Sequence, residues 1–253
     1  MQAPSAAELL VVWERARAQP MTTQALMLLA AASPGASWED LAKLSVGRRD
    51  ERLLVLREAL FGARLLGLTS CPRCRQQLEI GIQSTDIHID GDQSDRELLS
   101  VTSGAYVARF RLPNSEDLSA IAGRDDRQPD EAATIRKLLS RCLVELRRNG
   151  RRQRLDSSHG LPPALIEAIA AEMEKADPQA NVQIPLDCAD CGNRWLSAFD
   201  IVSFLWSEID NWAKRLLREV CALASAFGWS ESDILAMSAQ RRQLYLQMIG
   251  DAA

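Results

Sequence analysis

Two pairs of cysteines with the same spacing are the residues in this chain best suited to chemistry. Cys71 pairs with Cys74 in the sequence CPRC, and Cys188 pairs with Cys191 in the sequence CADC. Two-residue spacing lets both thiolates of a tight turn bind one ion, and two such turns supply the four ligands of a tetrahedral zinc site. The sequence therefore predicts one Zn²⁺ per chain. A closed four-cysteine site leaves no open coordination position, so this metal would support folding and not catalysis.

Other interpretations of these cysteines remain open. The pairs could form disulfides, act as a redox dithiol or stay as unliganded thiols, although neither pair stands in a βαβ pattern of the thioredoxin kind. His88 could be a surplus ligand, but four cysteines already complete the shell, and an exposed strand residue is the favoured interpretation. The remaining cysteines, Cys142 and Cys221, lie in apolar helical stretches and are expected to be small core residues.

The residue that follows each cysteine pair differs between the two turns. A glycine often stands there, because the turn reverses the chain sharply. Gly192 occupies this place after the second pair, whereas Arg75 occupies it after the first.

Composition describes an ordinary globular chain of 253 residues, with 47% hydrophobic and 25% charged residues. The formal net charge of −4 gives no whole-chain attraction for nucleic acid or for an anionic membrane. Residues 1–7 lack the basic region of a secretory signal, and the apolar stretch 26–32 is too short to span a bilayer. We therefore expect a cytoplasmic protein, since thiolates persist for metal in that reducing compartment.

Periodicity predicts the elements around the cysteines. Ser5 with Glu8 forms a capping box, and a helix over about 49–62 leads toward the first cysteine turn. Alternating apolar residues predict strands. They are expected at 78–83, 87–90, 98–112 and 182–186. Apolar stripes predict helices. They are expected at 130–148 and 162–176.

The C-terminal region begins with a helix over 198–227 that carries apolar residues at spacings of three and four. Two short helices follow it, after Gly228 and after Ser238. Trp206, Trp212 and Trp229 are interpreted as core residues, although an apolar face wider than the core needs would mark a partner site.

We thus expect an α+β fold that is mostly helical. Residues 1–70 form an N-terminal helical region. Residues 71–197 form a small β-sheet around the zinc-ribbon-like site, with an inserted αβ segment. Residues 198–253 form the C-terminal helical region.

The residues give little support to catalysis. No serine or cysteine has the arrangement of an activated nucleophile, and no glycine loop suited to phosphate stands in the sequence. We therefore expect a non-enzymatic protein with no small-molecule substrate. The basic run 147–154 is interpreted as a solvated loop, and contact with nucleic acid or an acidic partner is the alternative.

Several stretches resemble the hub or baseplate assembly chaperones of T4-type contractile phage tails, and related proteins of phage-derived contractile injection systems. Those before the insertion are GRRD at 47–50, LRE at 56–58 and the CPRC turn. Those after it are the CADC turn, Trp195, FDI at 199–201, FLW at 204–206, LLREV at 216–220 and GWSE at 228–231.

The resemblance implies an assembly factor, or chaperone, whose partners are baseplate or hub proteins of a contractile particle. One alternative is a permanent structural subunit of the baseplate. Another is a zinc-ribbon regulator that binds nucleic acid. The acidic net charge and the position of Trp229 in the turn before the last two helices argue against that regulator.

Overall fold

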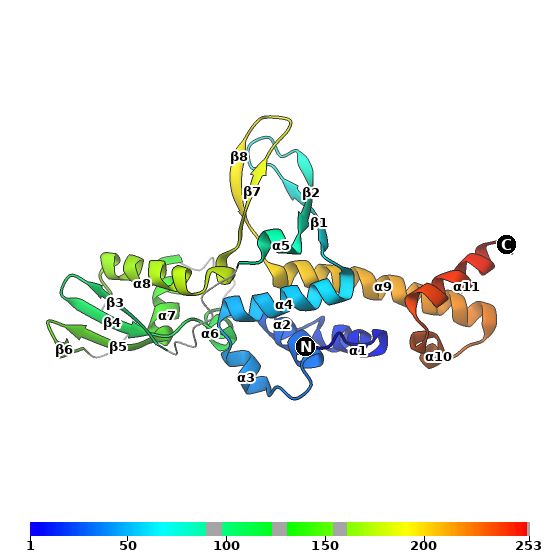
Figure 1. Cartoon of the computed structure of the whole chain (residues 1–253), viewed down its shortest axis with the longest axis horizontal. Coiled ribbons are helices and arrows are strands. Elements are labelled where there is room, and N and C mark those ends of the chain that lie inside the picture. The colour runs from blue at the N-terminus through cyan, green and yellow to red at the C-terminus, as the bar shows by residue number, and fades with distance from the viewer. Residues whose placement is uncertain (90–97, 123–130, 154–160, 252–253) are drawn as a thin grey trace. The chain divides into compact units, whose positions relative to one another are not determined.

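The chain is described here by a computed structural model that covers residues 1–89, 98–122, 131–153 and 161–251. Positions 90, 130 and 154, at the ends of predicted segments, lie outside these ranges. The chain divides into two compact units, Met1–Ala36 with Ile201–Ala253, and Ser37–Asp200. Figure 1 labels the elements of both units.

The first unit is helical. It consists of α1 (Ala6–Ala16), α2 (Met21–Ala32), α9 (Ile201–Phe227), α10 (Glu231–Ala236) and α11 (Ala239–Asp251). The predicted capping box at Ser5 and Glu8 starts α1. Buried Trp13 ties α1 to α9 by donating a hydrogen bond from Nε1 to Oδ1 of Asp210 at 2.9 Å.

The long helix α9 confirms the helical pattern read from the sequence. Its apolar residues at spacings of three and four are buried, and Gly228 follows its last turn at a φ of 69°. Helices α10 and α11 pack on its end around Val220, Leu223 and Ile234. The helix starts at Ile201 and not at 198, because the preceding residues form a strand. Cys221 is exposed, so its interpretation as a core residue was wrong.

No helix within the described residues combines the length and the apolar composition needed to cross a membrane. Helix α9 is long enough, but charged residues occupy the faces that its core does not use.

The second unit combines short helices with antiparallel strands. Its helices are α3 (Trp38–Lys43), α4 (Val46–Phe61), α5 (Ser84–Ile87), α6 (Ser115–Ile121), α7 (Glu131–Cys142), α8 (Pro163–Ala176) and the 3₁₀ turn η1 (Pro178–Asn181). Its strands are β1 (Arg64–Ser70), β2 (Gln77–Gln83), β3 (Leu99–Ser103), β4 (Tyr106–Phe110), β5 (Leu143–Arg148), β6 (Arg151–Arg152), β7 (Gln183–Asp187) and β8 (Arg194–Ala198).

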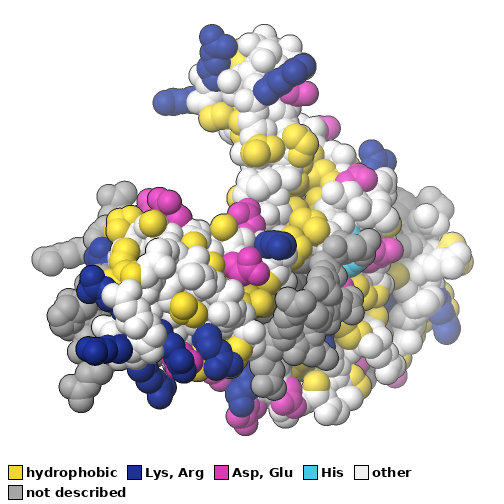
Figure 2. Space-filling model, turned by 60° about the vertical axis from the view of Figure 1, so that its left-hand side comes forward, with side chains coloured by type: hydrophobic (Ala, Val, Ile, Leu, Met, Phe, Trp, Pro, Cys, Tyr) yellow, Lys and Arg dark blue, Asp and Glu magenta, His cyan; other side chains and the backbone are white. Residues whose placement is uncertain are grey.

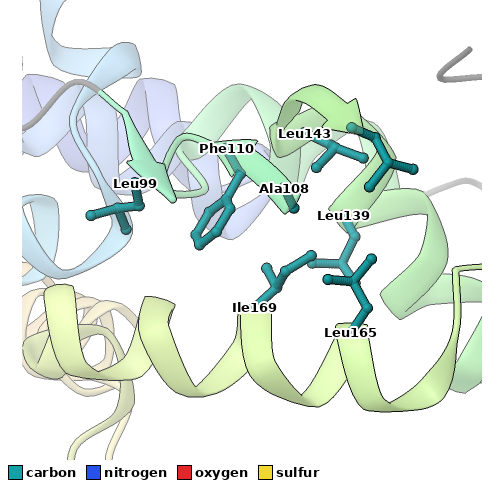
Figure 3. Close-up of a cluster of buried hydrophobic side chains, with 8 residues drawn as sticks. Leu99, Ala108, Phe110, Leu139, Leu143, Leu165 and Ile169 are labelled. Atoms are coloured by element: carbon teal, nitrogen blue, oxygen red, sulfur yellow. The ribbon is translucent and has the colours of Figure 1, made fainter. Parts of the chain in front are cut away.

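These strands form three sheets in the described residues. Two are the hairpins β1-β2 and β7-β8, and the third is the four-stranded sheet β3-β4-β5-β6. Helix α8 covers one face of the larger sheet, and Figure 3 shows the core between them. That core contains Leu99, Ala108, Phe110, Leu139, Leu143, Leu146, Leu165 and Ile169.

The helix predicted over 130–148 is wrong beyond Cys142, because the chain continues as strand β5. Leu143 and Leu146 both reach the core, which resembles helical spacing. The register between β4 and β5 shifts between Arg109 and Phe110, and this irregularity lets residues three apart face the same side of a strand. The bulge in this strand therefore produced the three-residue apolar spacing that is typical of a helix.

Two other local predictions were also wrong. The expected strand at 87–90 does not form over its described residues, because Ile87 ends α5 and residues 88–89 are not in a strand. The start of α5 is fixed by the Gln83 amide, which donates to Oδ2 of Asp86 at 3.0 Å. The basic run is not a plain loop but the hairpin β5-β6, turned by Asn149 and Gly150 at φ values of 50° and 76°. The overall class, α+β and mostly helical with small sheets, is confirmed. The sheet expected around the cysteines consists of two separate hairpins.

Candidate metal centre

The two cysteine pairs lie at the turns of the two hairpins. Cys71 and Cys74 connect β1 to β2, and Cys188 and Cys191 connect β7 to β8. Figure 1 shows both hairpins projecting side by side, with their turns at the same end. The structure therefore brings together all four predicted ligands, from two segments far apart in the sequence.

The two turns have the same backbone geometry. In each, the amide of the first cysteine donates to the carbonyl that closes the turn, on Gln76 or Asn193, at 2.9 Å. The residue after the second cysteine donates back to the first cysteine's carbonyl, also at 2.9 Å. That residue adopts a left-handed conformation in both turns, with φ of 63° at Arg75 and 66° at Gly192. Arg75 thus occupies a conformation that favours glycine.

The sulfur positions match a tetrahedral ligand set. Sγ of Cys71 lies 3.7 Å from Sγ of Cys191, and Sγ of Cys74 lies 3.6 Å from Sγ of Cys188. All four sulfurs lie within 4.8 Å of one another. Zn–S bonds of about 2.3 Å in a tetrahedron place the sulfurs about 3.8 Å apart. The four cysteines are free thiols, so the arrangement does not depend on disulfides.

The electrostatics of the thiols follow from their crowding. Burial opposes ionisation of Cys71, but hydrogen bonds to its sulfur from the amides of Cys74 and Arg73, and from the side chains of Cys191 and Cys74, together outweigh burial and lower its pKa to about 6. The Gln76 amide lowers the pKa of Cys74, but burial and the neighbouring cysteine sulfurs raise that pKa to about 12. One thiolate therefore forms readily and opposes the next, a conflict that a divalent cation removes.

Alternating residues on each hairpin support the turns. On β1 and β2, Leu65 is buried and Ile80 and Ile82 are half-buried, while their neighbours along the strands are more exposed. On β7 and β8, Leu186 and Trp195 are half-buried and directly opposite each other. Each hairpin thus has a sheltered apolar face and an exposed face, as expected of a half-buried antiparallel pair.

Buried Arg57 fixes the base of the first hairpin. It lies near the end of α4 and is 2% exposed. Its guanidinium donates to the carbonyls of Gly62 at 2.6 Å and Arg64 at 2.8 Å, which lie where α4 passes into β1. The neighbouring Glu58 accepts a hydrogen bond from Oγ of Ser84, after β2, at 2.8 Å. The LRE stretch therefore holds both ends of the hairpin.

Asp177 and Gln179 fix the base of the second hairpin, just before β7. The Asp177 carboxylate accepts from the amide of Gly47, at the start of α4, at 2.9 Å. Burial raises the pKa of Asp177, against the hydrogen bond from Gly47 that lowers it. Gln179 accepts from the amide of Ile89 at 2.7 Å and donates to the carbonyl of Ile87 at 3.1 Å. Gln179, which precedes the second hairpin, is thus hydrogen-bonded to the backbone that follows the first hairpin.

The GRRD stretch at the start of α4 completes this base. Gly47 has no room for a side chain, because a Cβ there would lie 2.2 Å from Oδ1 of Asp177. Arg49 is 4% exposed and donates to Oδ1 of Asp50 at 2.8 Å. Burial, with smaller contributions from the charges of Asp200 and Asp177, raises the pKa of Asp50 to about 6 against the opposing effect of the Arg49 guanidinium. Gly47 thus supports the base of the second hairpin through Asp177, and the GRRD stretch lies outside the four-cysteine group.

Other predicted and unpredicted residues can now be placed. His88 is exposed at the end of α5 and lies outside the four-cysteine group. Cys142 is buried, as predicted. Strands β1 and β8, and the supports Asp177 and Gln179, were not predicted. The only sequence signal for the supports is the Asp177-Pro178 step, which is typical of a turn.

Comparison with known proteins agrees with the motif positions. The family described as T4 bacteriophage base plate protein matches this chain over residues 21–206. That range includes the GRRD and LRE stretches, both cysteine turns and the start of α9. No curated protein and no solved structure matches the chain.

Proposed function

The chain belongs to the T4 bacteriophage base plate protein family, and from this premise we propose that it is a non-enzymatic assembly factor, or chaperone, for the baseplate or hub of a contractile phage tail or phage-derived contractile injection system. Its partners are then baseplate or hub proteins. Membership of the family over residues 21–206 is the observation that carries this proposal.

The placement of the family-like residues supports a role in binding and assembly. The GRRD and LRE stretches are used to fix the bases of two projecting hairpins, through Gly47 and Arg57. A scaffold that commits buried charged residues to positioning two hairpins is suited to presenting a fixed shape to another protein. We propose that its working compartment is the cytoplasm, where thiols stay reduced.

We further propose that Cys71, Cys74, Cys188 and Cys191 hold one structural Zn²⁺. The sulfur separations of 3.6 and 3.7 Å, near the tetrahedral value of about 3.8 Å, support it. Zinc would supply a cross-link between the two hairpins. Elemental analysis of the purified chain tests this: one zinc per chain is expected, and no metal with four titratable thiols would contradict it.

A permanent structural subunit of the baseplate is the second candidate, because family membership supports it as well. Deleting the gene tests whether either role holds. Both candidates predict that tails without a complete baseplate accumulate in electron micrographs, and that expression in trans restores them. Normal particle numbers and normal baseplates in the deletion strain would contradict both.

A further inference from the structure

The exposed face of the four-stranded sheet carries arginines from three adjacent strands. Ala108 and Phe110 of β4 point to the core under α8, so Arg109 between them points to the opposite face, where its side chain is 52% exposed. The strand register sets Arg109 opposite Glu145, and Arg147 opposite Arg152. We call Arg109, Arg147 and Arg152 the arginine face.

Glu145 lies among these arginines and orients them. Its side chain is 12% exposed, and it accepts from Nε of Arg147 at 2.8 Å and lies 3.5 Å from Nη1 of Arg109. The hydrogen bond from Arg147 lowers the pKa of Glu145, and the charges of Arg147, Arg152 and Arg109 lower it further. One carboxylate therefore faces three guanidiniums, so the arginine face keeps a positive charge.

Other arginines nearby divide into two groups. Arg111 and Arg141 have structural partners, since both bind the fully buried Asp117, at 2.5 and 2.9 Å. Arg148 lies over the ring of Tyr106 at 5.5 Å, and Arg151 is exposed beside it on β6. Figure 2 shows Lys and Arg side chains gathered on the lobe that comes forward. These basic side chains belong to a chain whose formal net charge is −4.

We propose that the arginine face binds a carboxylate-rich segment of a partner protein. This inference rests on the proposed function, because the partner would be a baseplate or hub component. Guanidinium forks pair with carboxylates through two parallel hydrogen bonds, and the three exposed side chains are all Arg and not Lys. Charge complementarity of this kind fixes partner choice and speeds association.

The dimensions and surroundings of the face favour a protein segment over nucleic acid. Adjacent strands lie about 4.8 Å apart, so β4 to β6 spans only about 10 Å, which suits a few carboxylates and not a long phosphate backbone. Tyr106 packs against the core on the opposite face of the sheet, so it does not offer a stacking surface for bases beside these arginines.

A binding assay with defined probes tests the proposal. The full chain is titrated against a labelled oligoglutamate peptide, and against a single-stranded DNA of equal charge, at low ionic strength. The test variant carries Arg109→Ala, Arg147→Ala and Arg152→Ala. The control variant removes the same number of exposed positive charges from helices. It carries Arg15→Ala, Arg52→Ala and Arg215→Ala.

The expected result is that the test variant binds the peptide about tenfold or more weakly, while the control variant binds within about twofold of the unmodified chain. Replacement of the same three arginines by lysine keeps the charge but loses the fork, and should weaken binding partially. Unchanged melting and one bound zinc check that each variant is folded. Tighter binding to DNA through these arginines, no binding of the peptide, or equal losses in both triple variants would overturn the proposal.

The same variants separate this inference from the proposed function. If the deletion strain assembles normal baseplates, the proposed function fails whatever the peptide shows. If assembly needs the protein, but the test variant restores it fully and binds the peptide normally, the inference about the arginine face fails alone.

Discussion

Gly47→Ala tests whether the base of the second hairpin is fixed as described. A Cβ at this position would lie 2.2 Å from Oδ1 and 2.7 Å from Cγ of Asp177, and 2.8 Å from the backbone nitrogen of Ala180. The carboxylate belongs to a buried residue that is 8% exposed, and the third atom is backbone. Neither can move aside easily, so the start of α4 must separate from η1.

Opposing effects decide the size of the change. Alanine favours a helix over glycine by about 0.5–1 kcal/mol. Against this, the 2.9 Å hydrogen bond from Gly47 to Asp177 is lost. Leaving its buried groups unpaired costs about 1–3 kcal/mol, and overpacking adds about 1–3 kcal/mol. We therefore expect a net loss of about 3 kcal/mol in the free energy of unfolding.

Denaturant titration of the zinc-loaded chain measures this change. Gly81→Ala is the matched control, because a Cβ there meets only Leu66 and Arg64 at 3.7 and 3.8 Å. It should change stability by less than about 1 kcal/mol. In a chain that already carries Asp177→Ala, Gly47→Ala should cost less, though not nothing, since the Ala180 nitrogen remains. Equal stability of Gly47→Ala and the unmodified chain would refute the reasoning.

Three further predictions concern the hairpin turns and Asp50. Cys71→Ser and Cys188→Ser should destabilise the chain equally and each abolish zinc binding, because both break one site; calorimetry with elemental analysis measures this, and unequal losses would indicate two separate roles. Arg75→Gly should stabilise the chain by about 1 kcal/mol and Gly192→Arg should destabilise it by a similar amount, since both positions have a left-handed backbone. Chemical denaturation measures both changes, and a destabilising Arg75→Gly or a stabilising Gly192→Arg would contradict this reasoning. Asp50 has a pKa of about 6 in the folded chain against an ordinary 3.8, so the folded chain binds this proton more tightly than the unfolded chain does. The stability that this proton contributes is present below about pH 4 and is lost as the pH rises through about 6. The loss should reach about 3 kcal/mol, and Asp50→Asn should flatten this part of the pH profile; an unchanged profile would contradict it.

Local signals in the sequence were sufficient for helices α1 and α9 and for the clustering of four cysteines. Ser5 with Glu8 caps α1, and the spacing of apolar residues predicts α9, because capping and amphipathic packing depend on residues a few positions apart. The repeated two-residue spacing predicted that four cysteines would meet, and they do.

Contacts between distant segments were beyond local signals. Burial alternates along strand β1, but two of its exposed positions carry Leu66 and Leu68, so apolar and polar residue types do not alternate in its sequence. Leu143 and Leu146 satisfied a helical stripe, and only pairing with β4 makes them a strand. The hydrogen bond from Gly47 to Asp177 joins two positions far apart in the sequence, and no local pattern predicts that they lie close together.

The arginine hairpin was missed for a different reason. Asn149-Gly150 is a strong signal for a two-residue hairpin turn, and the φ values of both residues fit a type I′ turn. The flanking arginines made the run look like a solvated loop, because hairpin recognition also expects alternating apolar residues beside the turn. The Asn149-Gly150 dipeptide predicts the hairpin when it is given more weight than the charge of the flanking arginines.

Quantitative mass spectrometry of purified mature particles tests the proposed role most directly. An assembly factor should be abundant in incomplete baseplates and fall well below one copy per mature particle. A stoichiometric amount in mature particles, at a constant ratio to the other baseplate proteins, would contradict the assembly-factor account and identify a permanent subunit.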